Sequence, residues 1–215
     1  MTRLAVLASG SGTTLQALLD AFPGGGVSAG AEGDPARPGA TVAVVVVNTP
    51  GAQSLDRGHR AGIPTVLVDH RGRSRESFET ELAGVIREHG ADLICLAGFL
   101  RILSPAFIAH HAGRILNVHP ALLPAFGGKG MHGERVHKEV LAARAAASGC
   151  TIHLVDEVPD GGPILAQIAV PVLDGDTPAT LAARVQAEER ALYPQVIRWL
   201  ADGRIRVEGS RALLT

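Results

Sequence analysis

The stretch LAVLASGSGTT (residues 4–14) decides the fold class. It begins with five consecutive apolar residues and passes through a Ser-Gly-Ser-Gly turn. It then enters a segment whose apolar positions Leu15, Leu18 and Leu19 recur at helical spacing. An unbroken apolar run is typical of a central parallel strand, because both of its faces are buried. The stretch therefore predicts a strand, a glycine turn and a helix in succession, as in α/β proteins with a parallel sheet.

The same alternation continues along the chain. Six more apolar runs predict strands, at residues 41–47, 65–68, 92–97, 115–118, 151–155 and 164–172. Ser74 is expected to cap a helix that runs to about Glu88, and Asp176 or Thr177, followed by Pro178, to begin a long final helix. We therefore expect a single α/β domain over residues 1–215, a doubly wound three-layer α/β/α structure with a mostly parallel seven-stranded sheet.

Composition narrows the class of protein. A net charge of −1 over 215 residues provides no electrostatic reason to expect nucleic acid or an anionic membrane as a partner. No apolar run has the length of a membrane span, and the first apolar run is too short for a secretory signal. Cys95 and Cys150 lack metal-type spacing, which suggests reduced thiols and a cytoplasmic protein. Residues 23–39, rich in glycine and proline, are expected to form a flexible surface loop.

The glycine turn at residues 10–14 is a candidate anion site. Backbone N–H groups and the dipole at the start of a helix favour an anion there. A dinucleotide fingerprint would need a third glycine at position 15, which is Leu15, and an acidic residue where Asn48 and Thr49 stand. The pattern therefore favours a single phosphate monoester over NAD. A tight turn without a ligand remains an alternative.

Asn117 and His119 are two positions apart in an apolar segment, so their side chains point to the same side of a strand. Taken alone, the pair is more often structural than catalytic. Asp160 lies in an Asp-Gly-Gly-Pro turn, where aspartate is also common for conformational reasons. The alternative is a carboxylate at the carboxyl edge of the sheet, where α/β proteins bind ligands, acting there as a proton acceptor. His132 and His137 do not have the His-Glu-x-x-His spacing, so no metal site is expected.

Taken in order, the motifs resemble the glycinamide ribonucleotide formyltransferase family, the folate-dependent enzymes of purine biosynthesis. The resemblance rests on ASGSGTTLQ (8–16), LAGFLRIL (96–103), NVHP (117–120), LLP (122–124), GCTIH (149–153), DGGP (160–163), ARVQ (183–186), Glu189 and Tyr193-Pro194. It implies transfer of the formyl group of 10-formyltetrahydrofolate to the amine of glycinamide ribonucleotide. It also implies a nucleotide-phosphate half at about residues 1–100 and a folate and catalytic half at about 101–215. The segment at residues 126–133 matches only some family members.

The resemblance also assigns roles to individual residues. It implies Asn117, His119 and Asp160 as the catalytic trio, and Gly12, Thr13 and Thr14 as the phosphate loop. It implies Gln186 and Glu189 as contacts to the rest of the ribonucleotide. The implied folate contacts are Arg75, Leu100, Arg101, Ile102, Leu103 and Asn117. No metal and no nucleotide triphosphate is implied, and the expected partners are the two small-molecule substrates of a monomer or homodimer.

The residues suit acyl transfer by direct attack of an amine. Asn117 and His119 can donate hydrogen bonds to the oxyanion that develops on the formyl group. Asp160 can assist the proton transfers and orient His119. Three rivals remain: a formyltetrahydrofolate hydrolase, a formyltransferase for initiator tRNA or a nucleotide sugar, and a non-catalytic module that binds a phosphorylated metabolite. We expect this chain to have neither the extra N-terminal domain of the hydrolase nor the extra C-terminal domain of the tRNA enzyme.

Overall fold

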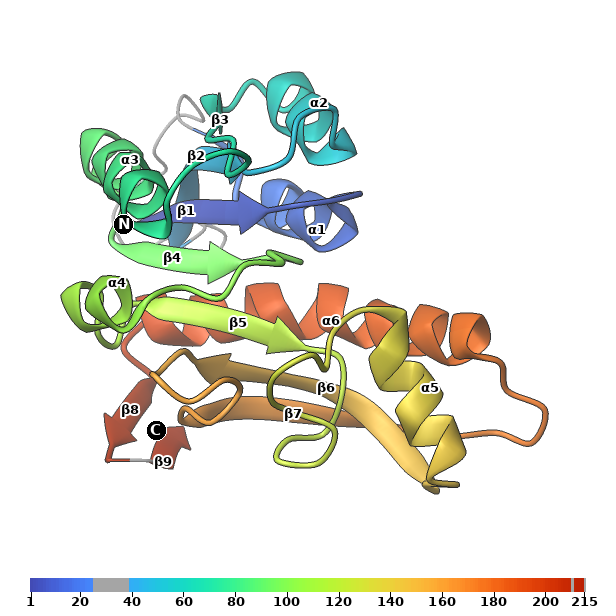
Figure 1. Cartoon of the computed structure of the whole chain (residues 1–215). Coiled ribbons are helices and arrows are strands. Elements are labelled where there is room, and N and C mark those ends of the chain that lie inside the picture. The colour runs from blue at the N-terminus through green and yellow to red at the C-terminus, as the bar shows by residue number, and fades with distance from the viewer. Residues whose placement is uncertain (25–38, 210, 215) are drawn as a thin grey trace.

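The computed structural model describes residues 1–24, 39–209 and 211–214, and its strands form one sheet in the order β3-β2-β1-β4-β5-β6-β7-β9-β8 (Figure 1). The strands are β1 (Thr2–Ala8), β2 (Ala40–Val47), β3 (Thr65–Leu67), β4 (Leu93–Leu96), β5 (Ile115–His119), β6 (Ala147–Leu154), β7 (Ile164–Pro171), β8 (Ile205–Glu208) and β9 (Arg211–Leu214). The helices are α1 (Thr13–Ala21), α2 (Gln53–Arg60), α3 (Arg75–Glu88), α4 (Pro105–His110), α5 (Glu134–Ala142) and α6 (Pro178–Ala201).

The α/β class and the mostly parallel sheet are confirmed. Five of the eight strand pairings in the described residues are parallel. The expected number of seven strands is wrong, because β8 and β9 form an additional antiparallel hairpin at the edge of the sheet. Both strands have four residues and are largely exposed, so they lack the apolar runs that identified the others. The alternation of Ile205 and Val207 with charged residues, followed by Gly209, was the available signal.

Helices cover both faces of the sheet. Alternate residues of β1 point to opposite sides, so Leu4 and Val6 join one core cluster and Ala5 and Leu7 the other. Helices α1, α5 and α6 supply side chains to the first cluster, and α3 and α4 to the second. This is the expected three-layer arrangement. No helix in the described ranges is both long and apolar enough to cross a membrane.

The capping residues expected from the sequence are confirmed. The Ser74 side chain accepts a hydrogen bond from the Ser77 N–H and caps α3. Thr177 caps α6 in a reciprocal capping box with Thr180. Helices α4 and α5 were not expected, since each is short and has only a few apolar positions. Of the predicted loop at residues 23–39, residues 25–38 lie outside the described part of the chain.

The antiparallel direction of β6 determines which of its residues lie opposite Asn117 and His119. Strand β6 runs antiparallel to β5, which places His153 opposite Asn117 and Thr151 opposite His119. The connection from β6 to β7 begins beside β5 and ends beside His153 of β6, because Leu154 pairs with Leu116 and Ile164 with His153. A side chain at Gly162 would come within 2.0 Å of the Leu154 carbonyl oxygen, so only glycine fits in this turn.

Candidate active site

The turn between β1 and α1 has the backbone geometry of an anion site. Gly12 adopts a left-handed conformation, with φ of 71°, and provides no side chain to cap the start of α1. Helices α3, α4 and α6 each begin with a side chain that accepts from the first turn, whereas α1, α2 and α5 do not. The first N–H groups of α1 are therefore open to an external acceptor, as they are in helices that bind phosphate.

Asn117, His119 and Asp160 meet at one place. Nδ1 of His119 lies 3.4 Å from Oδ2 of Asp160, and Asn117 lines the same cavity as both. The two β5 residues share a face of the strand, while Asp160 reaches them from the connection that follows β6. The convergence expected from the sequence is therefore present in the geometry, and the chemical roles of the three residues stay predictions.

Both ring nitrogens of His119 have a partner. Nε2 lies 2.8 Å from the carbonyl oxygen of Phe126, so Nε2 carries the hydrogen and donates it. Nδ1 faces Asp160. Burial lowers the pKa of His119, while the Asp160 carboxylate and the Phe126 carbonyl oppose that change. In this conformation the ring is oriented by two contacts and has no N–H directed to a substrate.

Asp160 is held as a carboxylate. The Gly128 N–H donates to Oδ2 at 2.9 Å, and Oδ1 lies 3.6 Å from Nε2 of His153. Burial by itself would raise the pKa of Asp160, but His119 and the Gly128 N–H lower it. Asp160 is therefore ionised near neutral pH, the form that accepts a proton.

His153 is a site residue to which no role was assigned from the sequence. It is 2% exposed, its Nδ1 donates to the Leu154 carbonyl oxygen at 2.9 Å, and Nε2 accepts from Asn117 Nδ2 at 3.1 Å. The bond to Leu154 determines which nitrogen carries the hydrogen. His153 thus directs the Asn117 amide. Its position two residues after Thr151 in a predicted buried strand was a signal in the sequence. The sequence does not show, however, that this strand pairs with β5.

The segment at residues 126–128 also proved part of the site. Phe126 has a positive φ of 55°, and its carbonyl oxygen accepts from His119. Gly128 supplies the N–H that binds Asp160. Two of the three trio members are thus held by backbone groups of this segment, which side-chain patterns do not reveal. His137 on α5 also lines the cavity, and its buried Nδ1 has no partner in the described structure.

A cavity of about 740 Å³ connects these features. All but one of the predicted site residues line it: Gly12, Thr13, Thr14, Leu100, Arg101, Ile102, Leu103, Asn117, His119, Asp160, Gln186 and Glu189. The exception is Arg75, which is exposed at the first turn of α3 and does not line the cavity. Its predicted folate contact therefore has no geometric support in this structure.

The cavity wall contains both apolar and ionisable side chains. In the segment that follows β4, Leu100 and Ile102 expose large apolar side chains to the cavity. Near α1, the α6 residues Gln186 and Glu189 face the glycine turn. Burial raises the pKa of Glu189 to about 7, and a hydrogen bond with Thr14 opposes the rise. In the described ranges, no group of three or more His, Cys, Asp or Glu side chains is placed to hold a metal ion.

Comparison with known proteins agrees with this geometry. The family described as Formyl transferase matches residues 2–197. The chain is 40% identical to phosphoribosylglycinamide formyltransferase of Escherichia coli over 212 residues, 98% of this chain and 92% of that protein. It is 38% identical to the human trifunctional purine biosynthetic protein adenosine-3, covering 95% of this chain but 19% of that protein.

Solved structures show the same fold over the whole length. Glycinamide ribonucleotide transformylase 1 from Symbiobacterium toebii superposes with a TM-score of 0.86 at 39% identity, covering 100% of this chain and 94% of that one. Phosphoribosylglycinamide formyltransferase from Brucella melitensis superposes with a TM-score of 0.79 at 41% identity, covering 97% of this chain and 98% of that one.

Proposed function

The chain belongs to the formyl transferase family, and we propose that its cavity transfers the formyl group of 10-formyltetrahydrofolate to the amine of glycinamide ribonucleotide in de novo purine biosynthesis. The observation that carries this proposal is the single cavity that joins the open N-terminus of α1 to the Asn117, His119 and Asp160 cluster. An anion site at one end and an acyl-transfer site at the other suit a phosphorylated amine.

The two substrates have separate parts of the cavity. The phosphate of the ribonucleotide binds the N–H groups at Gly12, Thr13 and Thr14, and the ribose side faces Gln186 and Glu189. The folate lies along residues 100–103, where Leu100 and Ile102 are 63% and 52% exposed. Such exposure of large apolar side chains inside a cavity suits a planar aromatic ligand. This arrangement brings the amine and the formyl carbon together beside Asn117.

The reaction needs no protein nucleophile. The amine of the ribonucleotide attacks the formyl carbon, a C–N bond forms, and the carbonyl oxygen becomes an oxyanion. The attacking nitrogen loses a proton, the folate N10 gains one, and the bond from N10 to the formyl carbon breaks. Asp160, ionised and open to the cavity, accepts the first proton, directly or through water. No metal and no nucleotide triphosphate takes part in this scheme.

Asn117 is the oxyanion donor that is already in place. One Nδ2 hydrogen binds His153, and the second remains for the substrate. Donation by His119 requires Nε2 to release the Phe126 carbonyl when substrate binds, since Nδ1 faces Asp160. Such donors stabilise the developing charge most strongly in a site from which water is excluded.

An assay of 10-formyltetrahydrofolate separates this function from its rivals. The purified protein should remove the formyl group only when glycinamide ribonucleotide is present, with formylated ribonucleotide as the product. Loss of the formyl group without any amine would instead identify a hydrolase. Transfer to a nucleotide sugar or to initiator tRNA, but not to the ribonucleotide, would also contradict the proposal. No loss with any amine would identify a binding module.

A further inference from the structure

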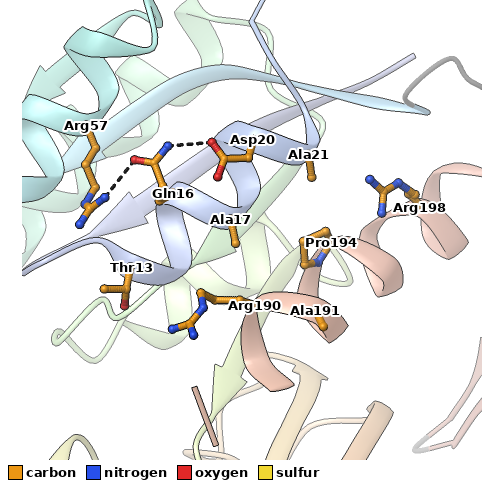
Figure 2. Close-up of a pocket in the computed structure, with 10 residues that line it drawn as sticks. All are labelled: Thr13, Gln16, Ala17, Asp20, Ala21, Arg57, Arg190, Ala191, Pro194 and Arg198. Atoms are coloured by element: carbon orange, nitrogen blue, oxygen red, sulfur yellow. Dashed lines mark hydrogen bonds between the residues drawn. The ribbon is translucent and has the colours of Figure 1, made fainter. Parts of the chain in front are cut away.

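We propose that Arg57 on α2 is a positioning residue for the substrate phosphate, acting through the turn between β1 and α1 rather than by touching the substrate. This inference rests on the proposed function and extends it to a residue outside the cavity. Arg57 lies on the outer side of α1, in a separate groove of about 640 Å³ that also contains Thr13 and Arg190 (Figure 2).

The guanidinium of Arg57 links the β1–α1 turn to the first turn of α1. Nε of Arg57 donates to the Ser11 carbonyl oxygen at 2.7 Å, and Nη1 donates to Oε1 of Gln16 at 3.0 Å. Gln16 in turn donates to Asp20 at 2.8 Å, so its amide is held in the correct orientation (Figure 2). The two donors of the planar guanidinium keep the turn and the helix in a defined relation, which a single-point donor would not do.

The bond to Ser11 determines where the turn directs its N–H groups. In a trans peptide the carbonyl and the next N–H point in opposite directions. Arg57 draws the Ser11 carbonyl toward α2, so the Gly12 N–H points away from α2. The Ser54 N–H does the same for the Gly10 carbonyl at 3.1 Å, which turns the Ser11 N–H away from α2. Neither N–H has an acceptor in the described residues, and both residues line the substrate cavity.

Packing around Gly12 adds to this constraint. A Cβ at Gly12 would lie 3.1 Å from Cδ of Arg57 and 3.1 Å from Ser54. The stem of Arg57 therefore packs directly against the turn whose left-handed glycine begins α1. Both acceptors of Arg57 are neutral oxygens, so the guanidinium acts here through the direction of its N–H groups.

The substitution Arg57→Gln tests the proposal, with Arg60→Gln as the matched control. Arg60 is on the same helix and its Nε donates only within the helix, to the Asp56 carbonyl. For Arg57→Gln we expect the KM for glycinamide ribonucleotide to rise about tenfold, as for loss of one charge-assisted contact. The kcat and the KM for 10-formyltetrahydrofolate should change less than about twofold, and Arg60→Gln should resemble the parent.

A substrate without phosphate shows whether the effect acts through the phosphate. With glycinamide riboside, the parent and Arg57→Gln should have the same kcat/KM. Arg57→Lys should stay near the Gln variant, because an ammonium cannot hold both acceptors in the guanidinium geometry. An unchanged KM for the ribonucleotide, or an equal loss with the riboside, would overturn the proposal.

Phosphate binding can be measured without the formyl-transfer reaction. Inorganic phosphate at millimolar concentration should raise the thermal unfolding temperature of the parent and of Arg60→Gln, and raise that of Arg57→Gln less. An equal rise in all three proteins would contradict the role of Arg57. A parent protein that transfers no formyl group would contradict the proposed function alone.

Discussion

Nδ2 of Asn117 lies 3.1 Å from Nε2 of His153, across the antiparallel pair formed by β5 and β6. Because Nδ1 of His153 donates to the Leu154 carbonyl, Nε2 has a free lone pair that accepts from the amide. The direction of the Asn117 amide is therefore set by a buried histidine that has no proposed contact with the substrate.

Replacing His153 should affect stability and turnover together. In His153→Leu the Asn117 amide and the Leu154 carbonyl lose a partner, which costs about 1–3 kcal/mol for each buried group left unpaired. We expect a lower free energy of unfolding in urea and a lower kcat. His153→Gln, which retains an acceptor for Asn117, should recover part of the turnover. His59→Leu, at an exposed position on α2 that does not line the cavity, is the control, and equal kcat values for all three variants would contradict the orienting role of His153.

Removing the amide of Asn117 should reduce turnover without preventing ribonucleotide binding. Loss of one oxyanion donor costs roughly 10²–10³ in kcat in comparable acyl-transfer sites. The phosphate contacts lie at the start of α1, on a different element, so the Kd of the ribonucleotide in Asn117→Ala should remain within about threefold of the parent. Calorimetry and steady-state kinetics measure the two quantities. A kcat near that of the parent would exclude Asn117 as an oxyanion donor.

Glu189 should make the protein less stable at higher pH. Its pKa is 4.5 in the unfolded chain and about 7 in the folded protein, because burial favours the neutral form. Between these values the folded state holds a proton that the unfolded state has lost. Stability therefore falls as pH rises above 4.5, and the penalty reaches its full value of about 3 kcal/mol above pH 7.

The variant Glu189→Gln removes that titration. Its free energy of unfolding in urea should match the parent near pH 4.5 and exceed it at pH 8. A difference that is the same at both pH values would mean that Glu189 does not titrate with a raised pKa. Glu188→Gln, the neighbouring position on α6, is the control.

The sequence was informative where local rules decide the structure. The apolar runs identified β1 to β7, and Ser74 and Thr177 marked helix starts because capping depends on neighbours in the chain. The glycine turn before α1 was predictable for the same reason. Strand alternation predicted that Asn117 and His119 share a face, whereas the grouping of both with Asp160 was implied by the family resemblance.

Long-range pairing and backbone groups could not be predicted in this way. His153 meets Asn117 only because β6 runs antiparallel to β5 in one register, which no local pattern determines. Phe126 and Gly128 act through a carbonyl and an N–H in a loop of unusual φ values, so their side chains provide no signal. The β8–β9 hairpin was missed because its strands are largely exposed and no buried apolar run marks them.

Asp160 is the proposed proton acceptor of the reaction, and Asp160→Asn tests that role most directly. The amide keeps the shape of the side chain but cannot accept a proton, so kcat should fall by about 10²–10⁴, while the Kd of the ribonucleotide stays near that of the parent. Asp174→Asn, at an exposed turn, should behave as the parent. The measurement is single-turnover formyl transfer from 10-formyltetrahydrofolate with the Kd determined on the same samples. Turnover near the parental value in Asp160→Asn would contradict the proposed mechanism.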